Sequence, residues 1–489
     1  MINKKMIYKV LGALLYIEVV LQLLCFLVAW GYEGLWGRPE QVAFLAAAVI
    51  TFMAAVTLRF MGGDVNESLS RRDAFLVVTL SWLMFSLFGT LPFIISGYET
   101  NFTNAFFESI SGFTTTGATI FDDVEMLPQG LLFWRSLMQW IGGLGIVFFT
   151  IAILPSVTGG SVRVFAAEAT GPIKTKLHPR LSMTAKWIWT VYLLLTAACI
   201  VCYYLFGMNG FDAINYGMTT LATGGFGTHN MATEFFDSPL IEYTAVFFCF
   251  LAGINFILLW NVVSRMRPMK LFQSAEFRLY LMLVFLCTVI IMVSLITHRD
   301  YEVEHAFRSA LFSVVSFITT TGLFNDDAGQ WPHITWIVLT LCMFIGAMSG
   351  STSGGFKCIR GVMIWRMIQN EFRQILHPNA VLPMDIDGNN VSQQRRNTLM
   401  SMVAIYLLLF LIASMVLGVS GVDSTKAITI TVSCLGNVGP TLGIEIGPTM
   451  SWRELPYFAK WVCSMYMLMG RLEIFTVLVI FTKAFWNEN

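Results

Sequence analysis

Four short segments of the sequence end in a glycine that follows hydroxyl-bearing or small residues. They are Phe113–Gly117, Leu221–Gly225, Ile318–Gly322 and Leu435–Gly439, here called the four glycine loops. An alanine stands twelve residues before each final glycine, at Ala105, Ala213, Ala310 and Ala427. Because glycine adopts positive φ readily, such a loop can turn its carbonyl oxygens toward a common axis. A ring of carbonyl oxygens can replace the hydration shell of a potassium ion, so the spacing predicts a cation pathway.

Short polar stretches lead into the four loops, at 104–116, 212–224, 306–321 and 424–438. They are too short and too rich in Ser, Thr and Gly to span a membrane, so we interpret them as half-helices. Their C-terminal ends carry partial negative charge, which attracts cations. Irregular backbone at membrane depth needs shielding by protein or a water-filled cavity, and four loops around one axis can shield one another. A single copy would instead indicate a polar turn in an ordinary bundle, but four equally spaced copies favour the pore.

The composition indicates that the bilayer is the solvent of this chain. Of its 489 residues, 56% are hydrophobic and 12% are charged, about half the charged fraction of a soluble protein. Long apolar segments predict ten spans. These are 7–30, 42–61, 74–97, 131–155, 184–207, 240–263, 279–297, 333–356, 398–420 and 457–486. The expected fold is an all-α integral membrane protein with four pseudo-symmetric span–half-helix–loop–span units around one central pore, plus two N-terminal spans.

The expected division of the chain follows from this repeat. Residues 1–66 hold the two extra spans, and 67–160, 161–268 and 269–372 hold the first three units. Residues 373–489 hold a cytoplasmic linker and the fourth unit. Loops rich in Lys and Arg alternate with loops rich in Asp and Glu, so the basic loops and both termini are expected in the cytoplasm. We find no P-loop, dinucleotide fingerprint, metal-ligand cysteine spacing or catalytic triad, so neither an enzyme nor an organic cofactor is expected.

The second span of the third unit is interrupted at 345–357. Its helix-weakening residues are Gly346, Ser349, Gly350, Ser351, Thr352, Ser353, Gly354 and Gly355, followed by Lys357. So many Gly and Ser residues disfavour a helix and predict a loop inside the membrane. The alternative is a helix-packing face of small residues, as we infer for Gly142, Gly143 and Gly145. The other three second spans contain no comparable stretch.

Two charged residues lie within apolar segments. Arg471 stands deep in the last span, and Glu473, two positions further on, faces elsewhere on a helix and is a poor direct partner. A charge at that depth marks a functional site by default. Arg471 either lines the pore or pairs with a carboxylate or a helix C-terminus elsewhere. Glu108, on the first half-helix, either adds negative potential near the ion path or is a hydrogen-bonded structural carboxylate.

These loops, together with Ser136–Gly145, His377–Val381 and Gly470–Glu473, resemble the Trk/Ktr/HKT superfamily of potassium transporters over the whole chain. The two extra N-terminal spans favour the membrane subunit of the bacterial Trk system. The resemblance implies a selectivity filter in the four loops. Its residues would be Thr115, Thr116, Gly117, Thr223, Gly224, Gly225, Thr320, Thr321, Gly322, Asn437, Val438 and Gly439. Gly117 favours potassium, because sodium-preferring plant relatives often carry Ser at that position.

The resemblance also implies a gate and partners. The 345–357 loop would block the path below the filter, and Arg471 would repel ions there. A homodimer and a cytoplasmic nucleotide-binding regulatory ring are expected, in a bacterial inner membrane, with no nucleic acid as partner. The expected function is potassium uptake. One alternative is a proton- or sodium-coupled symporter of the same fold, for which Glu108 is the ready coupling group; another is a membrane-embedded enzyme or scaffold.

Overall fold

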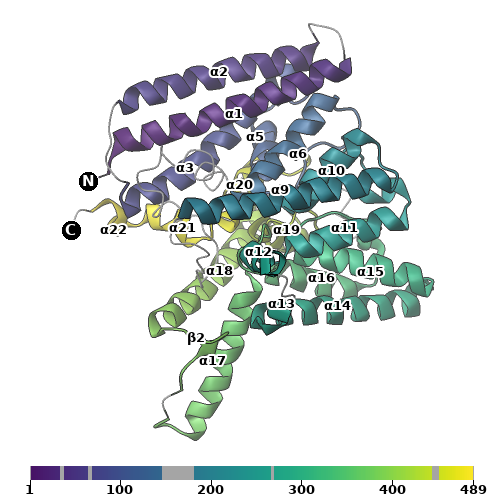
Figure 1. Ribbon diagram of the computed structural model, residues 1–489, viewed down its shortest axis with the longest axis vertical. Helices are drawn as coiled ribbons and strands as arrows, with labels where there is room; N and C mark the ends of the chain where they lie inside the picture. The colour runs from purple at the N-terminus through teal and green to yellow at the C-terminus, as the bar shows by residue number, and fades with distance from the viewer. Residues whose placement is uncertain are drawn as a thin grey trace.

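A computed structural model describes residues 2–33, 38–63, 69–145, 181–265, 269–380, 382–442 and 451–487. The described part is α-helical except for one two-stranded hairpin, which confirms the expected all-α class (Figure 1). The N-terminal pair α1 (Lys4–Glu33) and α2 (Pro39–Gly62) packs closely, because glycines lie at the contact. A Cβ on Gly12 would lie 2.8 Å from the Ala55 carbonyl oxygen, and one on Gly62 would lie 2.8 Å from the Lys9 amide nitrogen. Small residues commonly allow such approach between membrane helices.

The first half of the remaining chain contains two similar helix series. The first comprises α3 (Arg71–Gly89), α4 (Leu91–Ser96), α5 (Phe102–Phe113) and α6 (Gln129–Leu144). The second comprises α9 (Leu181–Leu205), α10 (Gly210–Ala222), the 3-10 helix η1 (Ala232–Phe236), α11 (Pro239–Ala252) and α12 (Phe256–Arg265).

The second half repeats the series twice. The third comprises α13 (Met269–Gln273), α14 (Ala275–Arg299), α15 (Val303–Ile318), η2 (Ala328–Gln330), α16 (His333–Ile345) and α17 (Cys358–Leu376). The hairpin of β1 (Asp385–Ile386) and β2 (Asn389–Asn390) follows, with Asp385 opposite Asn390. The fourth comprises α18 (Gln393–Val419), α19 (Ser424–Gly436), α20 (Tyr457–Arg471), α21 (Phe475–Leu478), η3 (Val479–Phe481) and α22 (Lys483–Trp486).

The half-helices α5, α10, α15 and α19 have 12, 13, 16 and 13 residues, so none is long enough to cross a bilayer. Three of them begin at a side chain that accepts a hydrogen bond from the first turn, namely Asn101, Asn209 and Asp423. Such caps satisfy backbone amides that a helix cannot satisfy itself. Each half-helix ends at one of the glycine loops, as expected.

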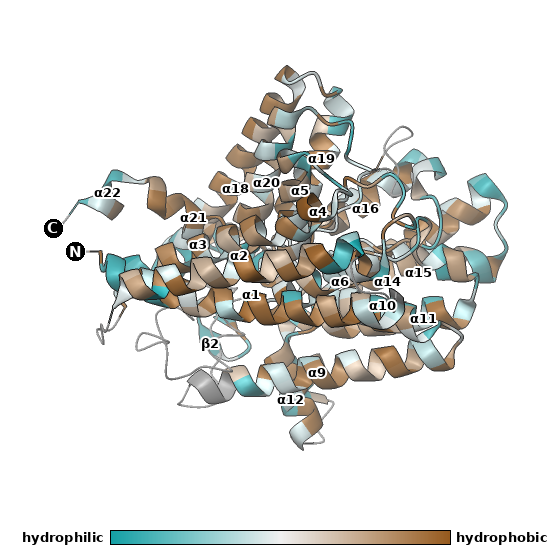
Figure 2. Cartoon of the chain, turned by 90° about the horizontal axis from the view of Figure 1, so that it is seen from above, coloured by the Kyte–Doolittle hydropathy of each residue, from teal (hydrophilic) through white to brown (hydrophobic). Residues whose placement is uncertain are grey.

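Nine of the ten predicted spans correspond to apolar helices. Among the described residues, six helices are long and apolar enough to cross a membrane, two bent helix pairs match two more spans, and α16 is a shorter apolar helix. The tenth, 131–155, begins as α6, and its second part lies outside the described residues. Hydrophobic residues cover most of these helices (Figure 2).

The second spans of the second and fourth series break as well as that of the third, which corrects the expectation that only the third is interrupted. The second span of the first series is described only as far as Gly145. Helix α6 ends before Gly145, α16 ends before Gly346, and α11 meets α12 at 100°. Helix α20 meets the α21–η3 segment at 110°. The continuous spans expected at 240–263 and 457–486 were therefore wrong. A hydropathy profile does not reveal these breaks, because a single residue can end one helix and begin the next. For example, Asn255 Oδ1 begins α12 by accepting hydrogen bonds from the amides of Ile257 and Leu258.

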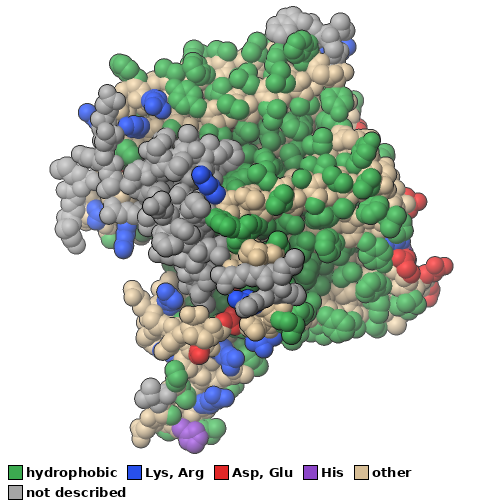
Figure 3. All heavy atoms as spheres, viewed as in Figure 1, with side chains coloured by type: hydrophobic (Ala, Val, Ile, Leu, Met, Phe, Trp, Pro, Cys, Tyr) green, Lys and Arg blue, Asp and Glu red, His purple; other side chains and the backbone are tan. Residues whose placement is uncertain are grey.

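Charged side chains gather at opposite ends of the apolar belt. Figure 3 shows most visible Lys and Arg side chains on the side of α17, and Asp and Glu side chains at the opposite edge, near the connection between α14 and α15. Both chain termini lie on the same side of the molecule in Figure 1. Between the two ends, large side chains such as Leu194, Phe285 and Leu411 are exposed, as the lipid-facing surface of a membrane protein requires.

Candidate functional site

The four glycine loops meet in a closed ring. A Cβ placed on the last glycine of each loop would collide with the carbonyl oxygen of the residue before the last glycine in the next loop. The pairs, in chain order, are Gly117 with Gly224 (2.1 Å), Gly225 with Thr321 (2.2 Å), Gly322 with Val438 (2.2 Å) and Gly439 with Thr116 (2.3 Å). The fourth pair closes the circle. No residue other than glycine fits at these four positions without displacing a backbone carbonyl.

The backbone of the four loops repeats at two positions. The last glycines have φ of 81°, 81°, 76° and 97° at Gly117, Gly225, Gly322 and Gly439. Two residues earlier, Thr115, Thr223, Thr320 and Asn437 have φ of 54°, 53°, 57° and 54°. Threonine is β-branched and rarely adopts this left-handed conformation, which costs about 1–3 kcal/mol at such sites. The same strain at the same position in four sequences indicates a shared backbone requirement, namely the direction of the carbonyl groups.

Glycines in α6 and α20 bring these helices against the ends of the half-helices. A Cβ on Gly142 would lie 1.8 Å from the Phe113 carbonyl oxygen, and one on Gly470 would lie 2.4 Å from the Leu435 carbonyl oxygen. The interpretation of Gly142 as a packing residue therefore agrees with the structure. These contacts hold the C-terminal ends of α5 and α19 in the ring.

Gln139 of α6 connects the first series to the second glycine loop. Its Nε2 donates to the Gly224 carbonyl oxygen at 2.6 Å, and its Oε1 accepts from the Phe226 amide at 3.0 Å. The side chain is fully buried. Gln139 was not among the site residues predicted from the sequence, although a polar Gln in the middle of an apolar span is a signal that could have identified it.

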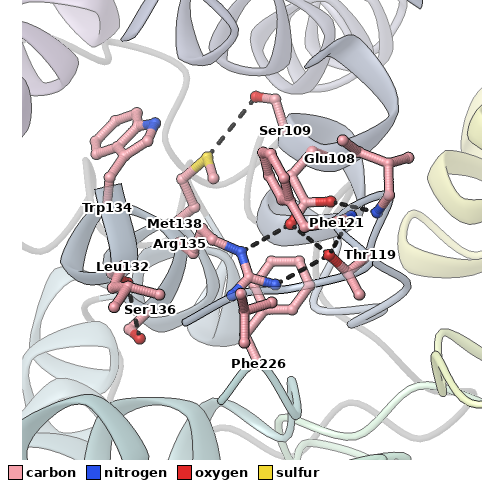
Figure 4. Close-up of polar contacts among 12 residues, drawn as sticks. Glu108, Ser109, Thr119, Phe121, Leu132, Trp134, Arg135, Ser136, Met138 and Phe226 are labelled. Atoms are coloured by element: carbon pink, nitrogen blue, oxygen red, sulfur yellow. Dashed lines mark hydrogen bonds and ion pairs between the residues drawn. The ribbon is translucent and has the colours of Figure 1, made fainter. Parts of the chain in front are cut away.

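A buried ion pair lies behind the first loop. Arg135 Nε donates to Glu108 Oε1 at 2.8 Å, and Glu108 Oε2 accepts from the Ile120 amide at 2.8 Å. Arg135 also donates to the Thr119 hydroxyl at 3.1 Å and lies 4.2 Å from the centre of the Phe226 ring (Figure 4). Glu108 is thus the hydrogen-bonded structural carboxylate of the two alternatives. The pair joins α5, α6 and the segment after the first loop.

All four terminal glycines line one cavity of about 80 Å³. Its other lining residues include those that follow the glycines, such as Ala118, Phe226, Phe324 and Pro440. Among the described residues, no group of three His, Cys, Asp or Glu side chains is arranged to hold a metal ion. The cavity is lined by the backbone of the four loops, and Asp122 also lines it.

Residues 346–357, here called the crossing loop, lie against the opposite side of the ring, where the half-helices end. The Thr352 hydroxyl donates to the carbonyls of Leu221 and Ala252 at 3.1 and 3.3 Å. The Gly354 amide donates to the Thr320 hydroxyl at 2.6 Å, and the Gly355 amide donates to the Gly436 carbonyl at 2.9 Å. The expected non-helical segment is present, and it touches three of the four glycine loops or their half-helices.

Arg471 holds the crossing loop from the fourth series. Its Nη1 donates to the Thr352 carbonyl at 2.7 Å, and its Nη2 donates to the Gly142 carbonyl at 2.7 Å and also to the Gly143 carbonyl. Arg471 thus pairs with the C-terminus of α6, which is one of the two expected alternatives, and it also contacts the crossing loop. A cation is favourable at a helix C-terminus.

Two further charged contacts lie beside Arg471. Lys357 Nζ donates to the Ser353 hydroxyl at 3.3 Å and to the Ser353 carbonyl, so it folds back onto the crossing loop. Glu473 pairs with Arg360 of α17 at 2.6 Å. Arg360 and Glu473 are 113 positions apart in the chain, so the spacing of neighbouring residues could not predict that they pair.

The family model described as the cation transport protein TrkH matches residues 40–488. The chain belongs to the TrkH family of cation transport proteins. The Trk system potassium uptake protein TrkH of Halomonas elongata is 36% identical over 487 residues, 99% of each chain. That of Escherichia coli K12 is 36% identical over 466 residues, 94% of this chain and 95% of the relative.

A solved structure supports the same assignment. The crystal structure of the potassium transporter TrkH from Vibrio parahaemolyticus matches with a TM-score of 0.88 and 33% identity, covering 99% of both chains. The predicted superfamily and the all-α membrane fold are therefore confirmed. These relatives are named as transporters, which favours transport over the alternative of a membrane-embedded enzyme or scaffold.

Proposed function

We propose that this protein takes up potassium ions through the ring of the four glycine loops, in a bacterial inner membrane. The closed ring, with the same two positive-φ positions in every loop, is the observation that supports this most. Carbonyl oxygens arranged around an axis can replace the hydration shell of potassium. The relatives named above are potassium uptake proteins, which supports potassium as the cargo.

The ring residues predicted from the sequence are the proposed filter, with Thr115–Gly117, Thr223–Gly225, Thr320–Gly322 and Asn437–Gly439 as its four segments. The hydroxyl oxygen of Thr115 and the amide oxygen of Asn437 are buried and have no hydrogen-bond partner among the described residues. Buried polar atoms normally find a partner. The Asn437 side chain lies against α20, where its Nδ2 donates to the Met467 carbonyl at 2.8 Å, so the backbone carbonyls of the ring are the proposed cation ligands.

The crossing loop is the proposed gate. It lies directly against the ends of the half-helices, and Arg471 fixes its centre at Thr352. An ion leaving the ring on that side would meet the loop and the guanidinium group. Opening therefore requires the loop to move and the bonds at Thr352 to break.

We also propose a homodimer regulated by a cytoplasmic nucleotide-binding ring. The relatives' names assign them to a Trk system, which supports a protein that works with other components. The basic side of the molecule, which includes α17 and the hairpin, is the proposed cytoplasmic face. Residues 366–397 are a proposed docking surface for this ring, and residues 156–186, most of which lie outside the described residues, are a second. A coupled symporter is less well supported, because Arg135 already neutralises Glu108.

Flux into liposomes tests the function. Wild type and Arg471→Ala, both confirmed as monodisperse, are compared for rubidium and sodium uptake without any partner. We expect rubidium to pass in preference to sodium, and faster in Arg471→Ala, because that variant frees the crossing loop. If Arg471→Ala passes neither ion, the proposed pathway is wrong, since the variant removes the need for a regulator.

A further inference from the structure

One carboxylate oxygen holds both ends of the crossing loop. Glu276, in the first turn of α14, accepts at Oε1 from the Ser349 amide at 2.6 Å and from the Ile359 amide at 3.0 Å. Ser349 lies near the beginning of the loop, and Ile359 lies in the first turn of α17, just after the loop ends. Bonds from amides to a carboxylate are stronger than bonds between neutral groups. A negative group at the start of α17 is also favoured by the dipole of that helix.

Glu276 is buried, with 7% of its surface exposed. Buried charges in a membrane protein are rare and usually functional. Neither the predicted filter nor the predicted gate included this residue. Glu276 stands at the beginning of a long apolar span, on the side of the molecule where α17 extends. In the sequence it therefore resembles an ordinary charged residue at the membrane interface.

The same turn of α14 is attached to the hairpin. Asp387 Oδ1 accepts from the Ala275 amide at 2.9 Å, and Ala275 directly precedes Glu276. Asp387 and Gly388 form the two-residue turn between β1 and β2, with φ of 51° and 78°. Both central residues of a type I′ turn have positive φ, which suits Asp-Gly. The turn therefore presents the Asp387 carboxylate to α14 in a defined geometry.

The hairpin packs against α17 rather than projecting freely, and β2 lies beside α17 in Figure 1. A small apolar cluster joins the two elements. Its buried members are Ile359, Met363, Met384, Ile386, Val391 and Leu399, and Ala275 packs against them. A continuous set of contacts thus leads from the hairpin through the first turn of α14 to both ends of the crossing loop.

We propose that Glu276 is a positioning residue that keeps the crossing loop against the ring, and that Asp387 of the hairpin holds Glu276 in place. This inference rests on the proposed gating role of the loop and deepens it. A protein that binds the hairpin and moves it away from α14 would release the loop without touching it. The bistable element is the crossing loop, either bonded to Glu276 or free of it.

The first test replaces Glu276 by Ala and by Gln in liposomes of the otherwise unchanged protein. Gln keeps an oxygen at the position of Oε1, so both amide bonds can form, whereas Ala loses both. We expect Glu276→Ala to raise rubidium flux several-fold and Glu276→Gln to raise it less, because Gln keeps both bonds but loses the charge that strengthens them. If Glu276→Ala leaves the flux at the wild-type level, or Glu276→Gln raises it more than Glu276→Ala does, the positioning role is wrong.

A second readout reports the loop itself, independently of flux. Ser351→Cys places a thiol at the centre of the crossing loop, and its reaction with a small hydrophilic thiol reagent is measured with and without Glu276→Ala. The labelling of the same protein without the added cysteine is measured in each case and subtracted. We expect several-fold faster labelling in the Ala variant. If the labelling rate is the same with and without Glu276→Ala, the inference is wrong. If labelling is faster in the Ala variant but no variant passes rubidium, the proposed function is contradicted instead.

The hairpin is tested with Asp387→Gly, which removes the carboxylate and tolerates positive φ. Asp385→Ala is the matched control, because this exposed residue lies on the same hairpin and lines the cavity beside α17. We expect Asp387→Gly to raise the rubidium flux and the labelling rate, and Asp385→Ala to change neither. In a protein that already carries Glu276→Ala, adding Asp387→Gly is expected to change both quantities little. Fully additive effects would show that Asp387 and Glu276 act separately and would overturn the proposed link.

Discussion

At the scale of single residues, the ring depends on side chains that are absent as much as on those that are present. The final glycine of each loop lies where a Cβ would strike a carbonyl oxygen of the next loop, and it also has positive φ. These two requirements are separate, because the chain contains a glycine that has only one of them. Gly97 has φ of 81°, equal to that of Gly117, and nothing lies within 4 Å of a Cβ built on it.

We predict that Gly117→Ala abolishes rubidium flux and that Gly97→Ala leaves it unchanged. The left-handed backbone alone costs alanine about 1–2 kcal/mol at either position. Only at Gly117 does the new methyl group meet the Gly224 carbonyl oxygen, at 2.1 Å before any relaxation. Flux and thermal unfolding of both variants measure this difference. Equal losses of flux would mean that backbone strain, not contact within the ring, explains the requirement for glycine.

The left-handed threonines show the limit of residue-level reasoning. The glycines were identified from the sequence because glycine is the usual residue at positive φ. Thr115, Thr223 and Thr320 share that conformation, and nothing in the properties of threonine predicts it. Their aligned position in the repeat was the available signal, and Asn437 at the same position was a better hint, since Asn tolerates this region more readily.

At the scale of elements, the broken second helices determine where the crossing loop lies. The break between α11 and α12 supplies three bonds to it. Asn255 Nδ2 donates to the Ser349 carbonyl at 2.6 Å, the Phe256 amide donates to the Gly350 carbonyl at 3.1 Å, and the Gly253 carbonyl accepts from the Met348 amide at 3.1 Å. Asn255 therefore starts one helix and holds the loop of another series.

We predict that Asn255→Ala raises basal rubidium flux, whereas Asn101→Ala does not. Both asparagines cap a helix, α12 and α5 respectively, so both variants lose about 0.5–2 kcal/mol of stability. Only Asn255 also bonds the crossing loop. Thermal unfolding checks that the two losses of stability are similar, and liposome flux separates the roles. A rise in flux in both variants would show that general loosening, not the bond to Ser349, opens the path.

The breaks were predicted for only one of the four series because the sequence signals differ. In the third series, eight Gly, Ser and Thr residues between 346 and 355 mark a long loop. In the second, a single Asn255 after Gly253 stops one helix and starts the next at 100°. A hydropathy window averages over such a short feature, so α11 and α12 were expected to form one span.

At the scale of the whole molecule, charge is divided between two faces. The acidic residues Glu302 and Glu304 lie near the start of α15, and α17 carries Arg366 and Arg373 at the opposite end of the molecule. By the positive-inside rule, we propose that the face with α17 is cytoplasmic. In that orientation an ion would enter the ring from outside and would meet the crossing loop on the inner side of it.

We predict that Glu302→Cys reacts with a membrane-impermeant thiol reagent in intact cells, and that Glu371→Cys on α17 reacts only after the membrane is opened. The background is low, because eight of the nine native cysteines are buried and Cys202 is partly buried. Labelling of the unaltered protein under both conditions is the control. The reverse pattern would place α17 outside and would contradict the proposed cytoplasmic docking surface.

The sequence by itself determined the membrane environment, the four loops and their half-helices, the interrupted third series and the family. These follow from composition and spacing, which are local and repeat along the chain. The tertiary structure alone decided that the loops close a ring, that Arg135 neutralises Glu108, and that Glu276, Asn255 and Arg471 hold the crossing loop. Such contacts join residues far apart in the chain, with Arg471 and Thr352 separated by 119 positions. Packing of the whole molecule, not the sequence near any one of these residues, brings them together.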